Sequence, residues 1–171
     1  MTVTIRQAIT EDAQVITCAE KEIAKTPGYF CSNPSELSEE SVRHTIESPL
    51  SIYLVAECNG QIVGHAFLES YSLKSLSHLA DLNIAVHLGW QKKGIGRALL
   101  LEIIERAKNS GVIEIIQLNV RASNIIAISL YKKLGFQEEG RLKNRLKIND
   151  DYIDDVVMAL DIRSSKESRD K

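Results

Sequence analysis

The chain has 171 residues, of which 44% are hydrophobic, and a formal net charge of −2 from 21 basic and 23 acidic side chains. This length fits one domain with a sizeable core, and the balanced charge excludes a global field that would attract nucleic acid or an anionic membrane. Three cysteines without C-x-x-C spacing argue against a disulfide framework and a structural zinc site, so we expect no metal. No apolar run is long enough for a signal peptide or a membrane span, so we expect a soluble, cytoplasmic protein.

The N-terminal part of the chain predicts a strand followed by two helices. Residues 3–7 alternate apolar and polar side chains, as a half-buried strand does. Thr10 precedes two acidic residues, which predicts an N-cap and a helix running to about residue 25, where Pro27 and Gly28 stop it. A second helix is expected at 38–47.

The loop between these helices, residues 26–36, carries Tyr29 and Phe30. Aromatic side chains on such a loop either complete the core or line a substrate site, and the sequence leaves both interpretations open.

Asn59-Gly60 marks a hairpin, because this dipeptide favours a type I′ turn and stands between two apolar segments, 52–58 and 61–68. The elements expected after the hairpin are strands at 79–86, 113–120, 136–148 and 152–162, and helices at 97–110 and 124–134. Together they predict an α/β fold in one domain over residues 1–162. The tail, 163–171, has no apolar residue and is expected to be disordered.

A glycine-containing loop predicts an anion site, because it joins the strand that ends at Val86 directly to the helix at 97–110. The N–H groups of a first helical turn have no partner within the helix, and glycine lets a phosphate approach the backbone closely. Lys92, Lys93 and Arg97 add local positive charge. The segment lacks the G-x-x-x-x-G-K-[ST] pattern, and the first strand-helix unit lacks G-x-G-x-x-G, so these nucleotide-binding loops fit poorly.

Several segments of the chain match the motifs of one family in order and spacing. They are Leu82-Asn83-Ile84-Ala85-Val86, Gln91-Lys92-Lys93-Gly94-Ile95-Gly96, Arg97-Ala98-Leu99-Leu100, Leu118-Asn119-Val120-Arg121-Ala122-Ser123-Asn124 and Tyr131-Lys132-Lys133-Leu134-Gly135-Phe136. With these motifs, the chain resembles the GNAT N-acetyltransferases over about residues 50 to 161.

The resemblance implies a mixed, mostly antiparallel sheet of seven strands, splayed between the fourth and fifth strands and flanked by about four helices. It also implies acetyl-CoA as co-substrate, wedged into that opening. The backbone of Ile84, Ala85 and Val86 would pair with the pantetheine, and Asn124 would bond the pantetheine arm. The backbone of the loop would hold the pyrophosphate through Gln91, Lys92, Lys93, Gly94, Ile95, Gly96 and Arg97.

Tyr131 is the predicted general acid, placed by the resemblance near the sulfur of acetyl-CoA. A phenol with a pKa of about 10 stays protonated at neutral pH and can protonate a departing thiolate. Asn124 stands seven residues earlier, on the same helix face, which supports the assignment. The alternatives are a half-buried structural tyrosine and, for Asn124, a helix N-cap.

The general base is less defined. Ribosomal-protein alanine N-acetyltransferases, which share the wording N-I-A-V and V-R-A-S-N, have a glutamate where this chain has Asn119, and a neutral amide cannot take a proton. Other members use a carboxylate or histidine early in the fourth strand, where this chain offers His78 and Asp81, with Glu69 at the end of the third. Each of these three fits a surface role as well, and ordered water is an alternative route for the proton.

The C-terminal segment, from Glu139-Gly140-Arg141 through residues 151–158, resembles members that act on free amino acids, polyamines or small amine toxins, including the phosphinothricin type. A small-molecule primary amine is therefore the expected acceptor, attacked directly in a ternary complex. Protein N-termini or lysines remain an alternative, and a non-catalytic acyl-CoA sensor is another. The aspartates at 150, 151, 154 and 155 are either acceptor-binding or a solvated turn and edge.

A homodimer is expected, because related proteins pair through their C-terminal strands. In addition, the apolar strand at 152–162 is predicted to be an edge that needs covering.

Overall fold

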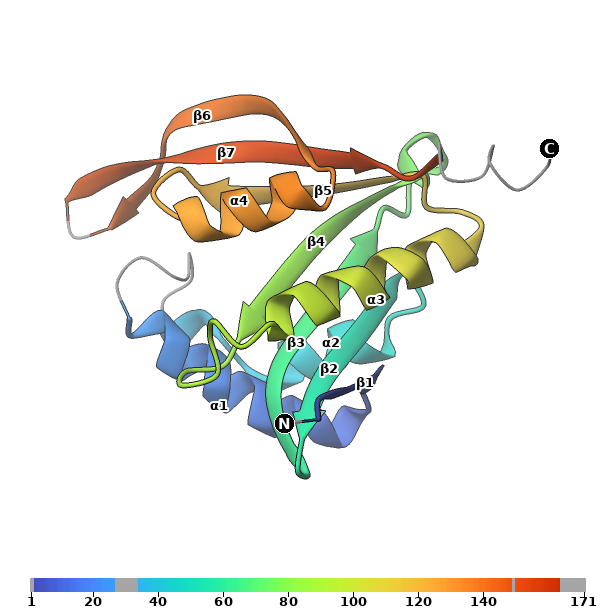
Figure 1. Cartoon of the computed structure of the whole chain (residues 1–171), viewed down its shortest axis with the longest axis vertical. Coiled ribbons are helices and arrows are strands. Elements are labelled where there is room, and N and C mark those ends of the chain that lie inside the picture. The colour runs from blue at the N-terminus through green and yellow to red at the C-terminus, as the bar shows by residue number, and fades with distance from the viewer. Residues whose placement is uncertain (1, 27–33, 149, 164–171) are drawn as a thin grey trace.

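The computed structural model describes residues 2–26, 34–148 and 150–163 of the chain. It contains a seven-stranded sheet in the order β1-β2-β3-β4-β5-β7-β6, with helices on both faces (Figure 1). The strands are β1 Thr4–Gln7, β2 Ser51–Cys58, β3 Gln61–Ser70, β4 Leu79–Val86, β5 Ile115–Arg121, β6 Gln137–Ile148 and β7 Asp151–Asp161. The α-helices are α1 Ala13–Ala24, α2 Glu39–Glu47, α3 Ile95–Ser110 and α4 Ile125–Lys133. The α/β class, the seven strands and the four helices expected from the sequence are confirmed.

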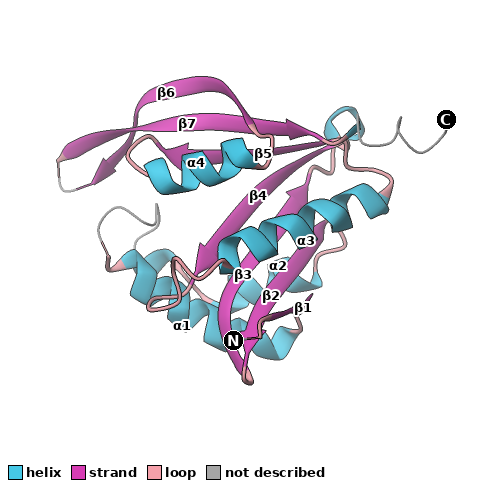
Figure 2. Cartoon of the chain, in the orientation of Figure 1, coloured by secondary structure: helices cyan, strands magenta, loops and turns pink. Residues whose placement is uncertain are grey.

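The helices form two layers around the sheet, as Figure 2 shows. Alternate side chains of β2 point to opposite faces, so Leu54 packs in the cluster that contains α3 and α4, whereas Tyr53 packs with Ile16 of α1 and Val42 of α2. No helix among the described residues is long and apolar enough to cross a membrane.

The start of α1 differs from the prediction. Residues Thr10–Asp12 form a short 3₁₀ turn, and the hydroxyl of Thr10 donates to Glu11 instead of capping the helix. Asp12 is the N-cap residue of α1 by position, but its side chain makes no capping bond to that helix. Its carboxylate instead accepts the Ile9 N–H at 2.9 Å, at the start of the 3₁₀ turn, and pairs with Arg6 at 2.7 Å. The predicted Thr10 cap is therefore wrong. In contrast, the Ser38 side chain caps α2 by accepting the Ser41 N–H.

The hairpin between β2 and β3 is confirmed. Asn59 and Gly60 both have positive φ, of 51° and 76°, as a type I′ turn requires. The pairing of Cys58 with Gln61 closes the hairpin.

The sheet opens between β4 and β5. These two parallel strands pair only through Leu79 with Ile115, Ala80 with Ile116, and Asp81 with Gln117. Beyond Asp81 they diverge, as Figure 1 shows, so the second half of β4 has no partner strand on its β5 side. The predicted splay between the fourth and fifth strands is confirmed, and it leaves backbone groups of β4 free to pair with an extended ligand.

The C-terminal strand is not an edge. β7 lies between β5 and β6, and the edges of the sheet are β1 and β6. The prediction that β7 needs covering is wrong because β6 folds back along it, which removes that argument for a dimer. Asp155 also departs from the predicted solvated edge, because it is only 5% exposed and burial raises the pKa of its carboxyl.

Some predictions fall outside the described residues. They are the stop at Pro27 and Gly28, the roles of Tyr29 and Phe30, the strand turn at Asn149, and the disorder of the tail from residue 164 onward.

Candidate active site

The loop before α3 ends in a backbone geometry that only glycine adopts easily. Gly94 is the N-cap of α3 with φ of 82°, and no side chain caps the helix. The N–H groups of Ile95, Gly96 and Arg97 therefore have no intrahelical acceptor and are available to an anion at the positive end of the helix dipole. The structure thus forms the strand-loop-helix cradle predicted from the sequence.

Side chains around this cradle leave its backbone accessible. Lys92, Lys93 and Arg97 are exposed, whereas the side chain of Ile95 is buried in the core, so Ile95 can contribute only its backbone. The ammonium of Lys93 lies 4.7 Å from the centre of the Trp90 ring. Gln91 donates from its side chain to the carbonyl of Val86 at 3.4 Å. The positive charge is therefore local, as expected.

Ile84, Ala85 and Val86 occupy the half of β4 that β5 has left. Their other edge pairs with β3, where Ala85 faces His65 and Val86 faces Gly64. Glycine suits this close approach, because a Cβ at position 64 would lie 3.1 Å from the Ala85 carbonyl oxygen, which is tighter than an ordinary contact. β4 is thus held against β3 and α3 while its opposite edge stays open.

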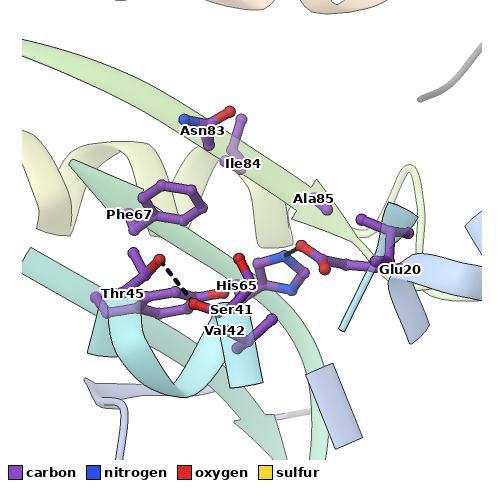
Figure 3. A pocket seen from close by; sticks show the side chains of 11 residues that line it. Glu20, Ser41, Val42, Thr45, His65, Phe67, Asn83, Ile84 and Ala85 are labelled. Carbon is purple, nitrogen blue, oxygen red and sulfur yellow. Dashed lines mark hydrogen bonds and ion pairs between the residues drawn. The ribbon is translucent and has the colours of Figure 1, made fainter. Parts of the chain in front are cut away.

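A cavity of about 230 Å³ lies between β4, β3, β2 and the helices α1 and α2, and Figure 3 shows its walls. Its lining residues are Glu20, Leu37, Ser41, Val42, Thr45, Tyr53, His65, Phe67, Asn83, Ile84 and Ala85. Ile84 and Ala85 belong both to this cavity and to the predicted pantetheine strand. The cavity therefore adjoins the place where the thioester end of the cofactor is expected.

Three buried polar side chains form a continuous chain behind the cavity. Glu20, His65 and His87 are 6%, 2% and 7% exposed. His65 Nε2 lies 3.2 Å from Glu20 Oε1, and His65 Nδ1 lies 3.2 Å from His87 Nε2. His87 Nδ1 is 3.0 Å from the carbonyl oxygen of Ile62. Burial, with the neighbouring His65, lowers the pKa of His87 to about 4.

The sequence reasoning missed this chain. One signal was available, because Glu20 stands four residues after Ile16 on the apolar face of the first helix. His65 likewise interrupts the apolar strand segment 61–68. A charged or titratable group at a core position needs a partner, but periodicity alone does not show which partner it has.

Tyr131 lies in the last turns of α4 and is 7% exposed. Its ring packs against Phe136 with 5.6 Å between ring centres, and burial raises the pKa of its phenol to about 12. The hydroxyl is therefore protonated at neutral pH, as a general acid requires. Asn124 caps α4, since its side-chain oxygen accepts the Ala127 N–H at 3.1 Å. This N-cap role leaves its amide N–H₂ for a ligand.

The predicted bases do not line the cavity. Asp81 sits where β4 and β5 separate, and its two oxygens accept from the Tyr71 hydroxyl at 2.6 Å and the Gln117 amide at 2.8 Å. The hydrogen bond to Asp81 raises the pKa of Tyr71. Glu69 pairs with Asp81 across β3 and β4 and is exposed. The backbone carbonyl of His78 accepts hydrogen bonds from the backbone N–H groups of Glu114 and Ile115, at the start of β5.

The remaining expectations from the sequence concern metal ligands and cysteines. Within residues 2–26, 34–148 and 150–163, no group of three or more His, Cys, Asp or Glu side chains could hold a metal ion. Cys18 is an exposed free thiol and Cys58 a buried one, and neither lines the cavity. Asn119 is exposed on β5, opposite Val157 of β7.

Known proteins share both the sequence and the fold. Residues 21–136 match the profile of the Acetyltransferase (GNAT) family. The L-amino acid N-acetyltransferase AaaT of Escherichia coli is 32% identical over 160 residues, 92% of this chain and 96% of that protein. A ribosomal-protein-alanine N-acetyltransferase of Escherichia coli is 44% identical over 80 residues, 47% of this chain and 53% of that protein.

Solved structures of acetyltransferases share the fold of this chain. A GNAT-family acetyltransferase from Streptococcus pneumoniae superposes with a TM-score of 0.83 at 28% identity, covering 94% of this chain and 99% of that one. The yncA acetyltransferase of Salmonella typhimurium, determined with its cofactor acetyl-CoA, gives a TM-score of 0.85 at 23% identity over 95% of each chain. The chain therefore belongs to the GNAT acetyltransferase family and is an N-acetyltransferase.

Proposed function

We propose that the protein transfers the acetyl group of acetyl-CoA to a primary amine of a small molecule, by direct attack in a ternary complex. The observation that carries this proposal is the cavity of about 230 Å³ that adjoins the unpaired half of β4. Drug-sized ligands occupy pockets of roughly 300–1,000 Å³, so this cavity suits a smaller molecule.

The chain's own residues fit acetyl-CoA at two places. The uncapped first turn of α3, with Lys92, Lys93 and Arg97 around it, offers backbone N–H groups and positive charge to a pyrophosphate. The open edge of β4 offers Ile84, Ala85 and Val86 to an extended pantetheine. Acetyl-CoA supplies the thioester, and Tyr131 holds the proton that the thiolate needs when the thioester is cleaved.

A protein N-terminus is the second candidate acceptor. The 44% identity to the ribosomal-protein-alanine enzyme supports it, but that match covers only 47% of this chain. The likeness to the amino-acid enzyme AaaT covers 92%, and so includes the helices that wall the cavity. The longer of these two matches therefore supports a small acceptor.

A non-catalytic acyl-CoA sensor is the alternative of another class. The basis for this alternative is Asn119, a neutral amide that cannot take a proton and that stands where the ribosomal enzymes have a glutamate. Asn119 does not line the cavity, whereas Glu20 does, so the chain retains a carboxylate at the acceptor side. We also propose a cytoplasmic location, because an exposed free thiol such as Cys18 suits a reducing compartment.

A thiol-release assay with acetyl-CoA over a panel of small amines, free amino acids and N-terminal peptides tests the proposal. We expect thiol release with small amines and binding of acetyl-CoA by calorimetry. Acetyl-CoA binding without thiol release from any member of the panel would favour the sensor. Activity with peptides alone would favour the protein acceptor. Parallel double-reciprocal lines with an isolable acyl-enzyme would contradict direct transfer.

A further inference from the structure

The positions of the protons in the Glu20–His65–His87 chain follow from its one fixed end. The carbonyl oxygen of Ile62 can only accept, so His87 Nδ1 carries a proton and donates it at 3.0 Å. With a pKa lowered to about 4, His87 is neutral at physiological pH, and its Nε2 bears a lone pair. His65 Nδ1 must then carry a proton and donate it to His87 Nε2.

This leaves one proton in the link between His65 and Glu20. Either His65 is an imidazolium that donates to a Glu20 carboxylate, or Glu20 is a carboxylic acid that donates to a neutral His65. Both forms are neutral as a pair, which suits their burial, since an isolated buried charge is costly. Without that proton, the lone pair on His65 Nε2 would face the negatively charged carboxylate of Glu20, and the two would repel each other.

The second oxygen of Glu20, Oε2, is not used in the bond to His65. Only Oε1 of Glu20 bonds His65, and Glu20 itself lines the cavity, as Figure 3 shows. The hydroxyl of Tyr53, another lining residue, is buried without a hydrogen-bond partner. Burial and the charge of Glu20 both raise the pKa of Tyr53, so its phenol keeps its proton at neutral pH and can only be a donor to a negatively charged or neutral acceptor. Among the described residues, the cavity lining thus holds both a buried hydroxyl donor without a partner and a carboxylate, which suits a polar ligand.

We propose that Glu20 binds the ammonium group of the acceptor and takes its proton, and that His65 and His87 are the residues that position it. This inference rests on the proposed acetyl transfer. In the imidazolium form, Glu20 Oε2 accepts one N–H proton of the ammonium, and the electron pair of that bond stays on nitrogen. The charge in the cavity is unchanged, because the proton only moves from the ligand to the pair.

The rest of the reaction balances with Tyr131. The neutral amine forms the N–C bond to the thioester carbon as the C–S bond breaks, and the sulfur takes the phenol proton of Tyr131. As the amide forms, the nitrogen transfers its second surplus proton to the phenolate oxygen of Tyr131, which becomes a phenol again. The proton on Glu20 returns to solvent when the products leave, giving one proton, one amide and one thiol in total.

Glu20→Gln tests the proposal, with Glu22→Gln as matched control, because Glu22 lies on the same helix but is exposed and pairs with Lys25. The acceptors are 2-phenylethylamine and 2,2-difluoro-2-phenylethylamine, whose fluorines leave a much larger fraction of that amine neutral. We expect Glu20→Gln to lower kcat/KM for the basic amine by roughly 10²-fold, the usual scale for a general base, and for the fluorinated amine far less. Acetyl-CoA affinity should stay within a few-fold. Equal losses on both amines would contradict the proposal.

The positioning role has its own test, which does not depend on turnover. Nitrogen-15 NMR of the histidine rings should show His87 protonated at Nδ1 and bare at Nε2, and protonation at Nε2 would overturn the inference. His87→Phe removes the acceptor for His65 and should lower kcat on 2-phenylethylamine, whereas His87→Gln keeps a side-chain carbonyl and should restore part of it. Equal activity of the two variants would argue for a packing role.

These measurements separate two kinds of failure. If the wild-type protein binds acetyl-CoA but acetylates no amine, the proposed function fails. Calorimetric binding of 2-phenylethylamine then decides the inference. Weaker binding to Glu20→Gln than to Glu22→Gln supports Glu20 as the ammonium site, and equal binding contradicts it.

Discussion

At the scale of single residues, burial gives Tyr131 a property that its sequence position does not. A free phenol has a pKa of about 10, and burial in the α4 side of the core raises it to about 12. A thiol has a pKa of about 8.5, below that of this phenol, so transfer of the phenol proton to the thiolate is uphill by itself and has to be coupled to the return of a proton from the nitrogen to the phenol. In the proposed reaction, Tyr131 would therefore act as a hydrogen-bond donor to the charge that develops on the sulfur.

Tyr131→Phe should separate chemistry from binding. The substitution keeps the ring and its packing on Phe136 but removes the acidic hydroxyl. Turnover should fall by roughly 10²-fold or more, while acetyl-CoA affinity, measured by calorimetry, stays within a few-fold. Tyr152→Phe is the control, because Tyr152 is 61% exposed on β7. If Tyr131→Phe keeps full turnover, or loses binding and turnover equally, Tyr131 is structural and the acid lies elsewhere.

The residues that the sequence identified are those with local signatures. Gly94 and Gly96 predict the loop before the helix. The seven-residue spacing of Asn124 and Tyr131 by itself predicts that they share a helix face. Glu20 and His65 have no such signature, because they meet only after α1 packs on the sheet. Asp81 was predicted from the resemblance, and the fold instead engages both of its oxygens with Tyr71 and Gln117.

At the scale of elements, the loop and the first turn of α3 work as one unit. Gly96 packs against α4 and β4, where an added Cβ would lie 3.5 Å from the Val86 side chain and 3.8 Å from that of Leu130. These are ordinary contact distances, so alanine fits at this position without displacing either neighbour. A negative charge at this position should act differently from a methyl group, because it would lie at the N–H groups that are proposed to bind the pyrophosphate.

Gly96→Asp should weaken acetyl-CoA binding by well over tenfold, which is more than about 1.4 kcal/mol, because it places a carboxylate where phosphates approach. Gly96→Ala should lose much less, which separates charge from bulk. Gly140→Asp adds the same charge on β6, where nothing lies within 4 Å, and should bind normally. Calorimetry with acetyl-CoA measures all three. Undiminished binding by Gly96→Asp would place the pyrophosphate elsewhere.

Element types were predictable from the sequence, but the order of the strands was less so. The apolar run at 79–86 predicted β4 with the correct first and last residues. The Asn59-Gly60 turn predicted how the two strands of the hairpin pair. The edge status of β7 could not be read from its apolar sequence, since an edge depends on which strand pairs with it. β7 pairs with β5 on one side and with β6 on the other, which leaves β6 at the edge, and the long-range pairing of β5 with β7 has no local signal.

At the scale of the whole molecule, the cavity joins parts of the chain that are far apart in sequence. Glu20 comes from α1, Ser41 from α2, His65 from β3 and Asn83 from β4. Its polar groups are one carboxylate, one imidazole and neutral hydroxyl or amide groups, and its lining among the described residues contains no lysine or arginine. This composition favours a cationic acceptor over one that also carries an anion.

A matched pair of acceptors tests this composition: 2-phenylethylamine and L-phenylalanine, which differ by one carboxylate beside the amine. That carboxylate would enter a cavity whose one cationic group in the proposed form, the His65 imidazolium, is already paired with Glu20. It would therefore lose hydration without a compensating partner. We expect kcat/KM for the amine to exceed that for the amino acid by at least about tenfold, or about 1.4 kcal/mol, mainly through KM.

The control for this pair is L-phenylalanine amide, which has similar bulk beside the amine but no negative charge. It should behave like 2-phenylethylamine if charge is the cause, and like L-phenylalanine if size is. The comparison also separates this chain from its relative AaaT, whose name describes an enzyme for L-amino acids. Equal kcat/KM for the amine and the amino acid would show that the carboxylate meets a partner outside the lining residues of the cavity.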